Sequence, residues 1–192
     1  MVFEQQKIES VFVFKPNVFS DHRGFFMETY RKDVFSEQGL NFEFVQDNHS
    51  KSVKGTLRGL HFQWEPPMGK LMRVTKGSAS LVAVDIRKDS ATLGEWFGIE
   101  VSEENKIQVF APAGCARGFL ALSDETEIQY KCTGIYNQNA ESGIKWDDPK
   151  IGIKWPIEDP ILSEKDKKQK TLDEWLQSPE SENFKMELFG VE

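Results

Sequence analysis

The amino-acid sequence predicts an all-β fold, a jelly-roll sandwich with a few short helices. Short apolar and aromatic runs recur along the chain, several alternate with a period of two, and turn-forming segments separate them. Few helical patterns lie between these runs, which favours a sandwich or barrel. A chain of 192 residues is long enough to bury a core without disulfides, so we expect one main domain.

The expected strands are rich in Val, Ile and Phe, and Gly, Pro, Asn, Asp and Ser fill the gaps between them. Two short helices are expected, over 31–38 and 163–177, and Ser163 is a suitable cap for the second. From about residue 178 the chain is polar and predicts a loosely held tail. The strand candidates are VFVFKP (11–16), FFMETY (25–30), FEFVQ (42–46), LMRVT (71–75), SLVAVDI (80–86), IQVFAP (107–112) and EIQYKC (127–132).

Charge, hydropathy and cysteine content argue against several classes of protein. A formal net charge of −7 disfavours general nucleic-acid binding. No run approaches the roughly 18 apolar residues of a membrane span, and the first ten residues lack the pattern of a secretory signal. Two cysteines, Cys115 and Cys132, are too few for a disulfide framework. We therefore expect a cytoplasmic protein with two reduced thiols.

The densest cluster of chemically capable residues spans QDNHS (46–50), LRGLHFQ (57–63) and GKL (69–71). Strand alternation would place Arg58 and Phe62 on one face, and Leu57 and His61 on the other. An Arg, a His and a Lys at one cavity would suit an anionic, carbonyl-bearing substrate. The guanidinium would bind phosphate, the imidazole would remove a proton and the ammonium would stabilise an enolate. Taken alone, His61 could equally be a core histidine with satisfied hydrogen bonds.

A metal centre is the obvious alternative for a small jelly roll. Metal-binding jelly rolls of the cupin type carry HxH, then a Glu, then a later His. This chain reads His61-Phe62-Gln63 and has Arg117 where the later histidine would stand. Two ligands are missing, so we expect no bound transition metal.

These segments together resemble the dTDP-4-dehydrorhamnose 3,5-epimerase family of deoxysugar synthesis. The resemblance covers nearly everything from residue 8 to about 172, and its specificity lies in the combination of motifs. It implies one cupin-like domain over 1–172, without metal or cofactor, usually in a homodimer that exchanges strands; 173–192 form an extension beyond it. The matching stretches are DHRGFF (21–26), FVQDNHS (44–50), LRGLHFQ (57–63), GKLMRV (69–74), VDIRKDSATLGEW (84–96), GFLALS (118–123), YKCTGIY (130–136), IKWDDPKIGIKWP (144–156) and LSEKD (162–166).

The resemblance implies a nucleotide-linked 4-keto-6-deoxyhexose as substrate, whose ketone acidifies the protons on C3 and C5. His61 would be the base, with Asp166 as its orienting carboxylate. Tyr130 would be the acid, and Lys70 would stabilise the enolate oxygen. Arg23 and Glu28 would reach the site of the neighbouring subunit. The substrate-binding residues implied are Arg23, Glu28, Gln46, Asn48, Arg58, Arg117, Tyr136 (stacked on the base), Glu141 and Lys165.

Two positions depart from the family pattern. The family's GFAHGF reads GCARGF at 114–119, so a substrate-contacting histidine has become Arg117. The aspartate of its FDVAVD stretch is Leu81 here. Both family positions line the sugar end of the pocket, so the local charge moves by up to two units in the positive direction. Our hypothesis is that the base, acid and nucleotide sites persist while sugar recognition has changed.

Three functions stay open on the sequence. The first is an epimerase that inverts C3, C5 or both, on this or another nucleotide sugar. The second is a ketoisomerase, which would move the carbonyl instead. The third is a nucleotide-sugar binding protein without catalysis. The joint presence of His61, Tyr130, Lys70 and Asp166 argues against the third, because a pure binder needs no acid–base pair.

Overall fold

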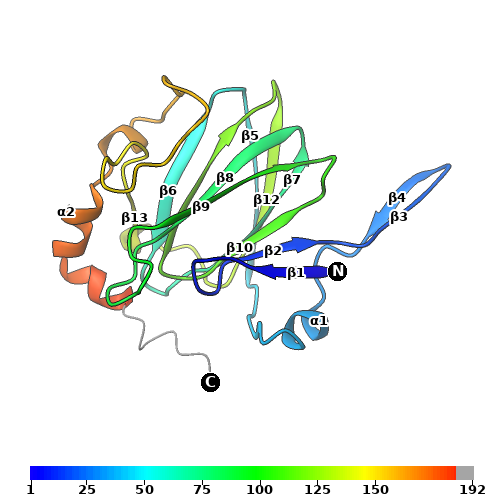
Figure 1. The fold of residues 1–192 in the computed structure, drawn as a ribbon, viewed down its shortest axis with the longest axis horizontal. Helices are drawn as coiled ribbons and strands as arrows, with labels where there is room; N and C mark the ends of the chain where they lie inside the picture. The colour runs from blue at the N-terminus through cyan, green and yellow to red at the C-terminus, as the bar shows by residue number, and fades with distance from the viewer. Residues whose placement is uncertain (185–192) are drawn as a thin grey trace.

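Two antiparallel β-sheets packed face to face make up most of the structure, a computed structural model that describes residues 1–184 (Figure 1). The predicted all-β sandwich is confirmed. The first sheet runs in the order β1 (Val2–Gln5), β2 (Phe12–Lys15), β10 (Gln108–Ala111), β7 (Lys70–Lys76), β12 (Thr126–Cys132) and β5 (Gln46–Ser52). The second runs in the order β13 (Glu141–Gly143), β6 (Leu57–Gln63), β11 (Cys115–Ala121), β8 (Ser78–Asp85) and β9 (Trp96–Ser102).

All seven predicted strand segments overlap an observed strand, but the segment 42–46 does so only at its last residue, Gln46. Strand β5 begins only at Gln46, and the backbone before it is irregular. The Phe42 and Phe44 rings pack on Phe110, with ring centroids 4.2 and 6.4 Å away. Burial of two alternate aromatic rings therefore explains the apolar pattern there without a strand.

Successive side chains of a strand point to opposite faces of its sheet, and the apolar ones fill the space between the two sheets. Val13, Met72 and Ile128 from the first sheet meet Ala83 and Val101 from the second, and all are almost fully buried. Each large aliphatic side chain buried in this way contributes about 1.5–3 kcal/mol to folding. The core between the sheets therefore contributes strongly to the stability of the fold.

The five-stranded sheet is also covered on its outer face. Phe62 packs there against Trp175, with ring centroids 4.5 Å apart, and Phe184 lies beside both rings. Burial on both faces explains why every residue of β11 is buried. The expected loose tail is thus wrong for 179–184, whose Phe184 side chain is fully buried, while 185–192 lie outside the described residues.

The helices are shorter than predicted. Helix α1 covers Lys32–Ser36 within the predicted 31–38. The predicted 163–177 helix is interrupted: a 3-10 turn, η2 (Asp166–Lys168), precedes α2 (Leu172–Gln177), which begins with its own Thr171–Glu174 capping box. The other 3-10 turns are η1 (Gln138–Ala140) and η3 (Pro179–Phe184).

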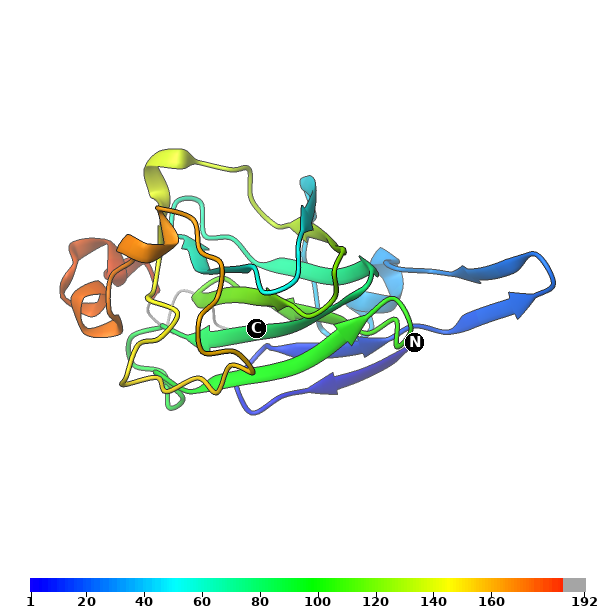
Figure 2. The same ribbon diagram turned by 90° about the horizontal axis from the view of Figure 1, so that it is seen from above.

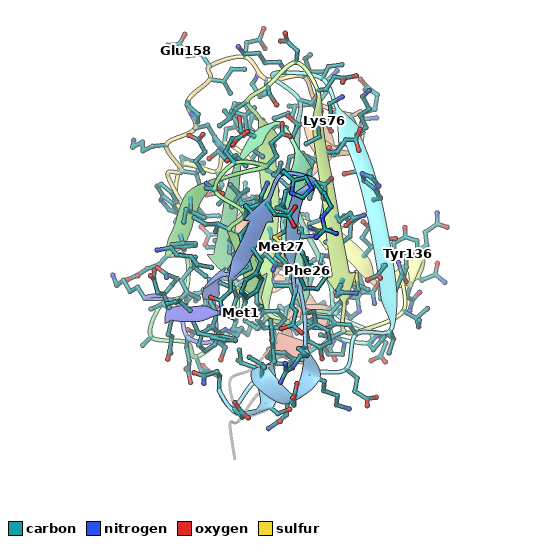
Figure 3. The ribbon with its side chains drawn as sticks, turned by 90° about the vertical axis from the view of Figure 1, so that its right-hand side faces the viewer. Met1, Phe26, Met27, Lys76, Tyr136 and Glu158 are labelled. Carbon is teal, nitrogen blue, oxygen red and sulfur yellow. The ribbon has the colours of Figure 1, made fainter. Side chains whose placement is uncertain are left out.

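A hairpin of β3 (Val18–Asp21) and β4 (Gly24–Met27) projects from the sandwich, as the blue ribbon in Figures 1 and 2 shows. Phe19, Phe25 and Phe26 on this hairpin are 64, 55 and 66% exposed. Figure 3 looks at the molecule from that side, with Phe26 and Met27 in front of the sheets. The hairpin therefore places three aromatic side chains in contact with water.

Candidate active site

His61 and Asp166 form a close pair at one end of the sandwich. The His61 Nε2 atom lies 2.5 Å from Asp166 Oδ1, and Ser163 Oγ donates to Asp166 Oδ2 over 2.7 Å. Asp166 is only 3% exposed. Burial raises the pKa of this carboxyl, but hydrogen bonds from His61 and Ser163 outweigh it, and the pKa lies below its usual 3.8. The carboxylate is therefore charged at neutral pH and fixes the orientation of the imidazole.

Backbone pairing brings these two residues together across 105 positions of the chain. His61 lies on β6, and β13 pairs alongside it with Gly143 opposite His61. Directly after β13, Lys145 N donates to Lys170 O over 2.7 Å and Ile144 bridges to Lys170. These contacts hold the segment around η2 against β6, and so place Asp166 beside the imidazole.

A cavity of about 130 Å³ opens between the two sheets next to this pair. Lys70 and Tyr130 come from the six-stranded sheet, while His61 and Arg117 are register partners in the five-stranded sheet. The Lys70 Nζ atom lies 4.8 Å from the centre of the Tyr130 ring. The residues that line the cavity are Ser50, Arg58, His61, Lys70, Met72, Arg117, Gly118, Phe119, Ile128 and Tyr130.

The cavity is electropositive because its lining includes Arg58, Lys70 and Arg117 but no Asp or Glu. Burial, helped by the charge of Arg117, lowers the pKa of Lys70 to about 8. Burial likewise lowers the pKa of Arg117 to about 10 and raises that of Tyr130 above its usual 10.0. Such a site can hold an anion or stabilise negative charge that develops on a ligand.

A register shift in the β6–β11 pairing changes which side chains face the cavity. The shift falls between Arg117 and Phe119, where a Cβ on Gly59 would lie 2.6 Å from Gly118 Cα. Only glycine permits that approach, and Gly59 has a φ of +146°. As a result Arg58 and His61 line the same cavity, whereas Phe62 packs on the outer face. The expectation that Arg58 and Phe62 share a face was therefore wrong.

Gln46 and Asn48 extend the site along β5. They occupy alternate positions of the strand, and Gln46 Nε2 donates to Asn48 Oδ1 over 3.1 Å. The Tyr136 backbone N–H donates to Gln46 Oε1 over 2.9 Å. Asn48 Nδ2 in turn donates to Cys132 Sγ over 3.6 Å. Ser50, two positions after Asn48 on the same strand, lines the cavity, so these two amides continue the site along the edge strand of the six-stranded sheet.

Tyr136, Glu141 and Lys165 form a second hydrogen-bonded group at this edge. The Tyr136 hydroxyl donates to Glu141 Oε2 over 3.0 Å, and Lys165 Nζ binds the same oxygen. Tyr136 is 52% exposed and lies at the side of the sandwich in Figure 3. Lys165 directly precedes Asp166, so this group adjoins the His61–Asp166 pair. The ring of Tyr136 is open to a ligand at the mouth of the site.

Arg23, Glu28 and Leu81 neither line this cavity nor belong to the hydrogen-bonded groups around Gln46 and Tyr136. Arg23 is on the projecting hairpin, where its guanidinium binds Asp21 over 2.6 Å, and Glu28 lies 3.7 Å from Arg31 just beyond the hairpin. Leu81 was expected at the sugar end, but its side chain is 1% exposed, belongs to the core and does not line the cavity. Its register partner Phe119 lines the cavity in its stead, so the expectation for Leu81 was wrong.

The sequence interpretation did not identify Ser50 or Ser163 as site residues. Ser50 follows Gln46 and Asn48 on alternate positions of β5, and this alternation was the signal that could have found it. Ser163 received only a capping role, yet it also binds the carboxylate of Asp166. Cys115 and Cys132 are both buried and unpaired.

Residues 1–184 also bear on whether the protein could hold a metal ion or cross a membrane. No three His, Cys, Asp or Glu side chains in this part of the chain come close enough together to hold a metal ion. Within the same range, no helix has the length and apolar character needed to cross a membrane.

Comparison with known proteins gives one consistent family. Residues 5–174 match the family model described as dTDP-4-dehydrorhamnose 3,5-epimerase. The chain is 53% identical over 175 residues to the dTDP-4-dehydrorhamnose 3,5-epimerase of Methanothermobacter thermautotrophicus, covering 90% of this chain and 95% of that protein.

Solved structures of related enzymes share the fold. A dTDP-6-deoxy-D-glucose-3,5-epimerase from Legionella pneumophila, in complex with dTDP-4-keto-L-rhamnose, has a TM-score of 0.89 at 40% identity, covering 94% of this chain and 96% of that one. A 3'-monoepimerase from Streptomyces bikiniensis, in complex with dTDP-quinovose, has a TM-score of 0.85 at 32% identity, covering 90% and 88% of the two chains.

Proposed function

This chain belongs to the dTDP-4-dehydrorhamnose 3,5-epimerase family, and from that premise we propose how its residues divide the work of the reaction. The protein is an isomerase that acts on a dTDP-linked 4-keto-6-deoxyhexose and inverts carbons next to the ketone. The ketone acidifies the protons on C3 and C5, so each inversion needs a base, a stabilised enolate and an acid on the opposite face.

His61 is the base in this proposal. Asp166 holds the Nε2 atom at 2.5 Å, which leaves Nδ1 as the ring nitrogen that takes the proton from the sugar. The carboxylate then stabilises the imidazolium that forms, as in other carboxylate–histidine pairs. Ser163 supports the pair by binding the second carboxylate oxygen.

Lys70 stabilises the enolate oxygen in this proposal. Loss of the proton leaves negative charge on the ketone oxygen, and the cavity offers a cation with no carboxylate beside it. Because the pKa of Lys70 is about 8, the ammonium form prevails at neutral pH. This chain's own side chains thus supply the positive charge that the enolate needs.

Tyr130 is the acid that returns a proton. It stands on β12 of the six-stranded sheet, whereas His61 stands on β6 of the five-stranded sheet. A sugar bound between the sheets therefore has the base on one side and the acid on the other, as inversion requires. This opposition of the His61–Asp166 pair and Tyr130 across one cavity is the observation that carries the proposal.

The nucleotide lies, in this proposal, along the edge of the site. Gln46, Asn48 and Arg58 hold the diphosphate and the nucleoside, Tyr136 stacks on the base, and Glu141 and Lys165 complete the mouth. The exposure of Tyr136 and its hydrogen bonds to Gln46 and Glu141 support this arrangement. Arg117 contacts the sugar.

We also propose that the enzyme is a homodimer that exchanges its projecting hairpin. Exposed aromatic surface of this kind marks interaction sites, and Phe19, Phe25 and Phe26 provide it. Arg23 and Glu28 would then reach the nucleotide of the neighbouring subunit. Light scattering tests this: Phe26→Asp should give a monomer with weakened dTDP binding, and an unchanged dimer would contradict the proposal.

The cytoplasm is the location that fits best, because Cys115 and Cys132 are buried, unpaired thiols.

Incubation with dTDP-4-keto-6-deoxyglucose in D₂O tests the function. Solvent deuterium should enter the sugar next to the ketone, with inversion of that carbon and without a shift of the carbonyl. No exchange at C3 or C5 would contradict the substrate, and a moved carbonyl would show a ketoisomerase.

Inversion of a single carbon is the second candidate function. Arg117, in place of the family's histidine, favours it, and so does the fold similarity to the 3'-monoepimerase of Streptomyces bikiniensis. The same D₂O experiment separates the two outcomes, because deuterium at only one of C3 and C5 would identify a single-centre epimerase.

A further inference from the structure

Gly143 on β13 leaves a space beside the side chain of His61. The two residues are register partners, and opposite residues of antiparallel strands place their side chains on the same face of the sheet. A Cβ on Gly143 would lie 2.7 Å from the Leu60 backbone oxygen, closer than Cβ atoms come to other atoms in proteins. Glycine is therefore required here, and the position opposite His61 is open to a side chain from elsewhere in the chain.

The side-chain amide of Gln169 fills that space. Its Cδ atom lies 2.6 Å, and its Nε2 atom 2.8 Å, from the position that a Cβ on Gly143 would take. Within residues 1–184 this Nε2 atom is buried and has no hydrogen-bond partner. The nitrogen end of the amide thus contributes packing against Gly143 and no hydrogen bond.

Gln169 belongs to the segment that carries Asp166. It directly follows η2, and the next residue, Lys170, accepts a backbone hydrogen bond from Lys145 over 2.7 Å. The segment is therefore tied to β6 by the pair of Asp166 with His61, and to the residues after β13 by Lys170. Gln169 packs between these two ties, so the fit of its amide sets how closely η2 approaches β6.

We propose that Gln169 is a positioning residue, which sets the contact between Asp166 and His61 by packing into the space at Gly143. This role rests on the proposed function, because it requires that His61 removes the proton. The hydrogen bond from Nε2 to Oδ1 is 2.5 Å long, so a small retreat of η2 would weaken it. A displacement of about 1 Å at a reacting group can cost about 100-fold in rate.

Two substitutions of Gln169 test the packing role. Gln169→Ala empties the space, whereas Gln169→Met refills it without an amide, because methionine is similar in length and adapts to irregular gaps. Gln169→Ala should lower kcat by about 10- to 100-fold, with KM and the affinity for dTDP within about 2-fold of wild type. Gln169→Met should keep kcat within about 3-fold of wild type.

NMR of protein with isotope-labelled histidine reports the contact itself. The chain has three histidines, so the signal that His61→Ala removes belongs to His61. The proton between Nε2 and Asp166 should resonate far downfield in wild type and in Gln169→Met, because a short hydrogen bond deshields its proton. In Gln169→Ala the signal should move upfield or be lost by exchange with water. A merely structural role would lower the unfolding midpoint without moving this signal.

A matched control and the possible outcomes separate this role from the function beneath it. Gln177→Ala makes the same change at the exposed end of α2 and should leave kcat and the signal unchanged. Wild-type kcat in Gln169→Ala, a lowered kcat with an unmoved signal, or equal losses in Gln169→Ala and Gln169→Met would each overturn the role of Gln169 and leave the epimerase intact. If Gln169→Ala does not fold, the shorter amide of Gln169→Asn decides, and wild-type kcat there would overturn the role. If the wild-type protein incorporates no deuterium at C3 or C5, the proposed function itself fails.

Discussion

Replacement of Lys70 by methionine should stabilise the protein while destroying its activity. Burial beneath Tyr130 and the nearby charge of Arg117 lower the pKa of Lys70 from its usual 10.5 to about 8. At 1.36 kcal/mol per pKa unit, holding this ammonium in the folded protein costs about 3 kcal/mol at pH 7. Methionine fills a similar volume without the charge and so removes the cost.

The pH dependence of this gain identifies its cause. Below pH 8 both the folded and the unfolded wild-type chains carry the proton on Lys70, so the full cost applies. Between pH 8 and 10.5 only the unfolded chain keeps it, and wild-type stability therefore rises with pH relative to the variant. The advantage of Lys70→Met should be about 3 kcal/mol at pH 7, about 2 at pH 9 and below about 1 at pH 10.5.

Urea unfolding at matched protein concentration measures these differences. Lys131→Met, which removes a lysine paired with Asp47 on the outer face of the same sheet, is the matched control and should stay within about 0.5 kcal/mol of wild type throughout. A stability gain that is constant from pH 7 to 10.5 would refute the reasoning, since it would reflect packing and not charge. Activity should fall by about 10²- to 10³-fold, the range for loss of a group that stabilises an oxyanion.

Three other substitutions test separate parts of the structure. Asp166→Asn should lower kcat by about 10- to 150-fold, because it replaces a charged partner of His61, and steady-state kinetics with unchanged dTDP binding would support this. Tyr130→Phe should allow deuterium exchange through His61 but reduce inversion by about 10²- to 10⁴-fold, and equal loss of both in proton NMR would speak against its role as acid. Trp175→Ala should destabilise the protein by about 3–5 kcal/mol in urea unfolding, because the indole is fully buried against Phe62. A change below about 1 kcal/mol would show that the packing of the C-terminal segment does not stabilise the sheet.

The strands could be predicted from the sequence because they depend on local alternation, whereas the site residues were implied by the family resemblance. Gln46 and Asn48 share a face because they are two residues apart on one strand, and the apolar runs predicted where strands lie but not which of them pair. Alternation failed at Arg58, because the register shift beside Gly59 is a property of the β6–β11 pair and not of either strand alone.

Contacts between distant segments were beyond local reasoning. Asp166 meets His61 only because β13 and the Ile144–Lys170 bridge hold the η2 segment against β6, and the family resemblance was what linked the two residues beforehand. Phe184 showed the same limit, since its polar neighbours predicted a loose tail while its ring is buried on the outer face of the sheet. Leu81 was expected at the cavity because of its place in a family motif. A motif does not show that the side chain of the neighbouring Phe119 lines the cavity while Leu81 lies in the core.

The most direct test of the proposed mechanism is deuterium exchange by His61→Ala. The variant should bind dTDP nearly as well as wild type, because His61 lies at the sugar cavity and not at the Tyr136 edge where the nucleotide is proposed to bind. In D₂O it should incorporate no deuterium at C3 or C5 of the keto sugar. Exchange at the wild-type rate would show that another group removes the proton and would contradict the assignment of the base.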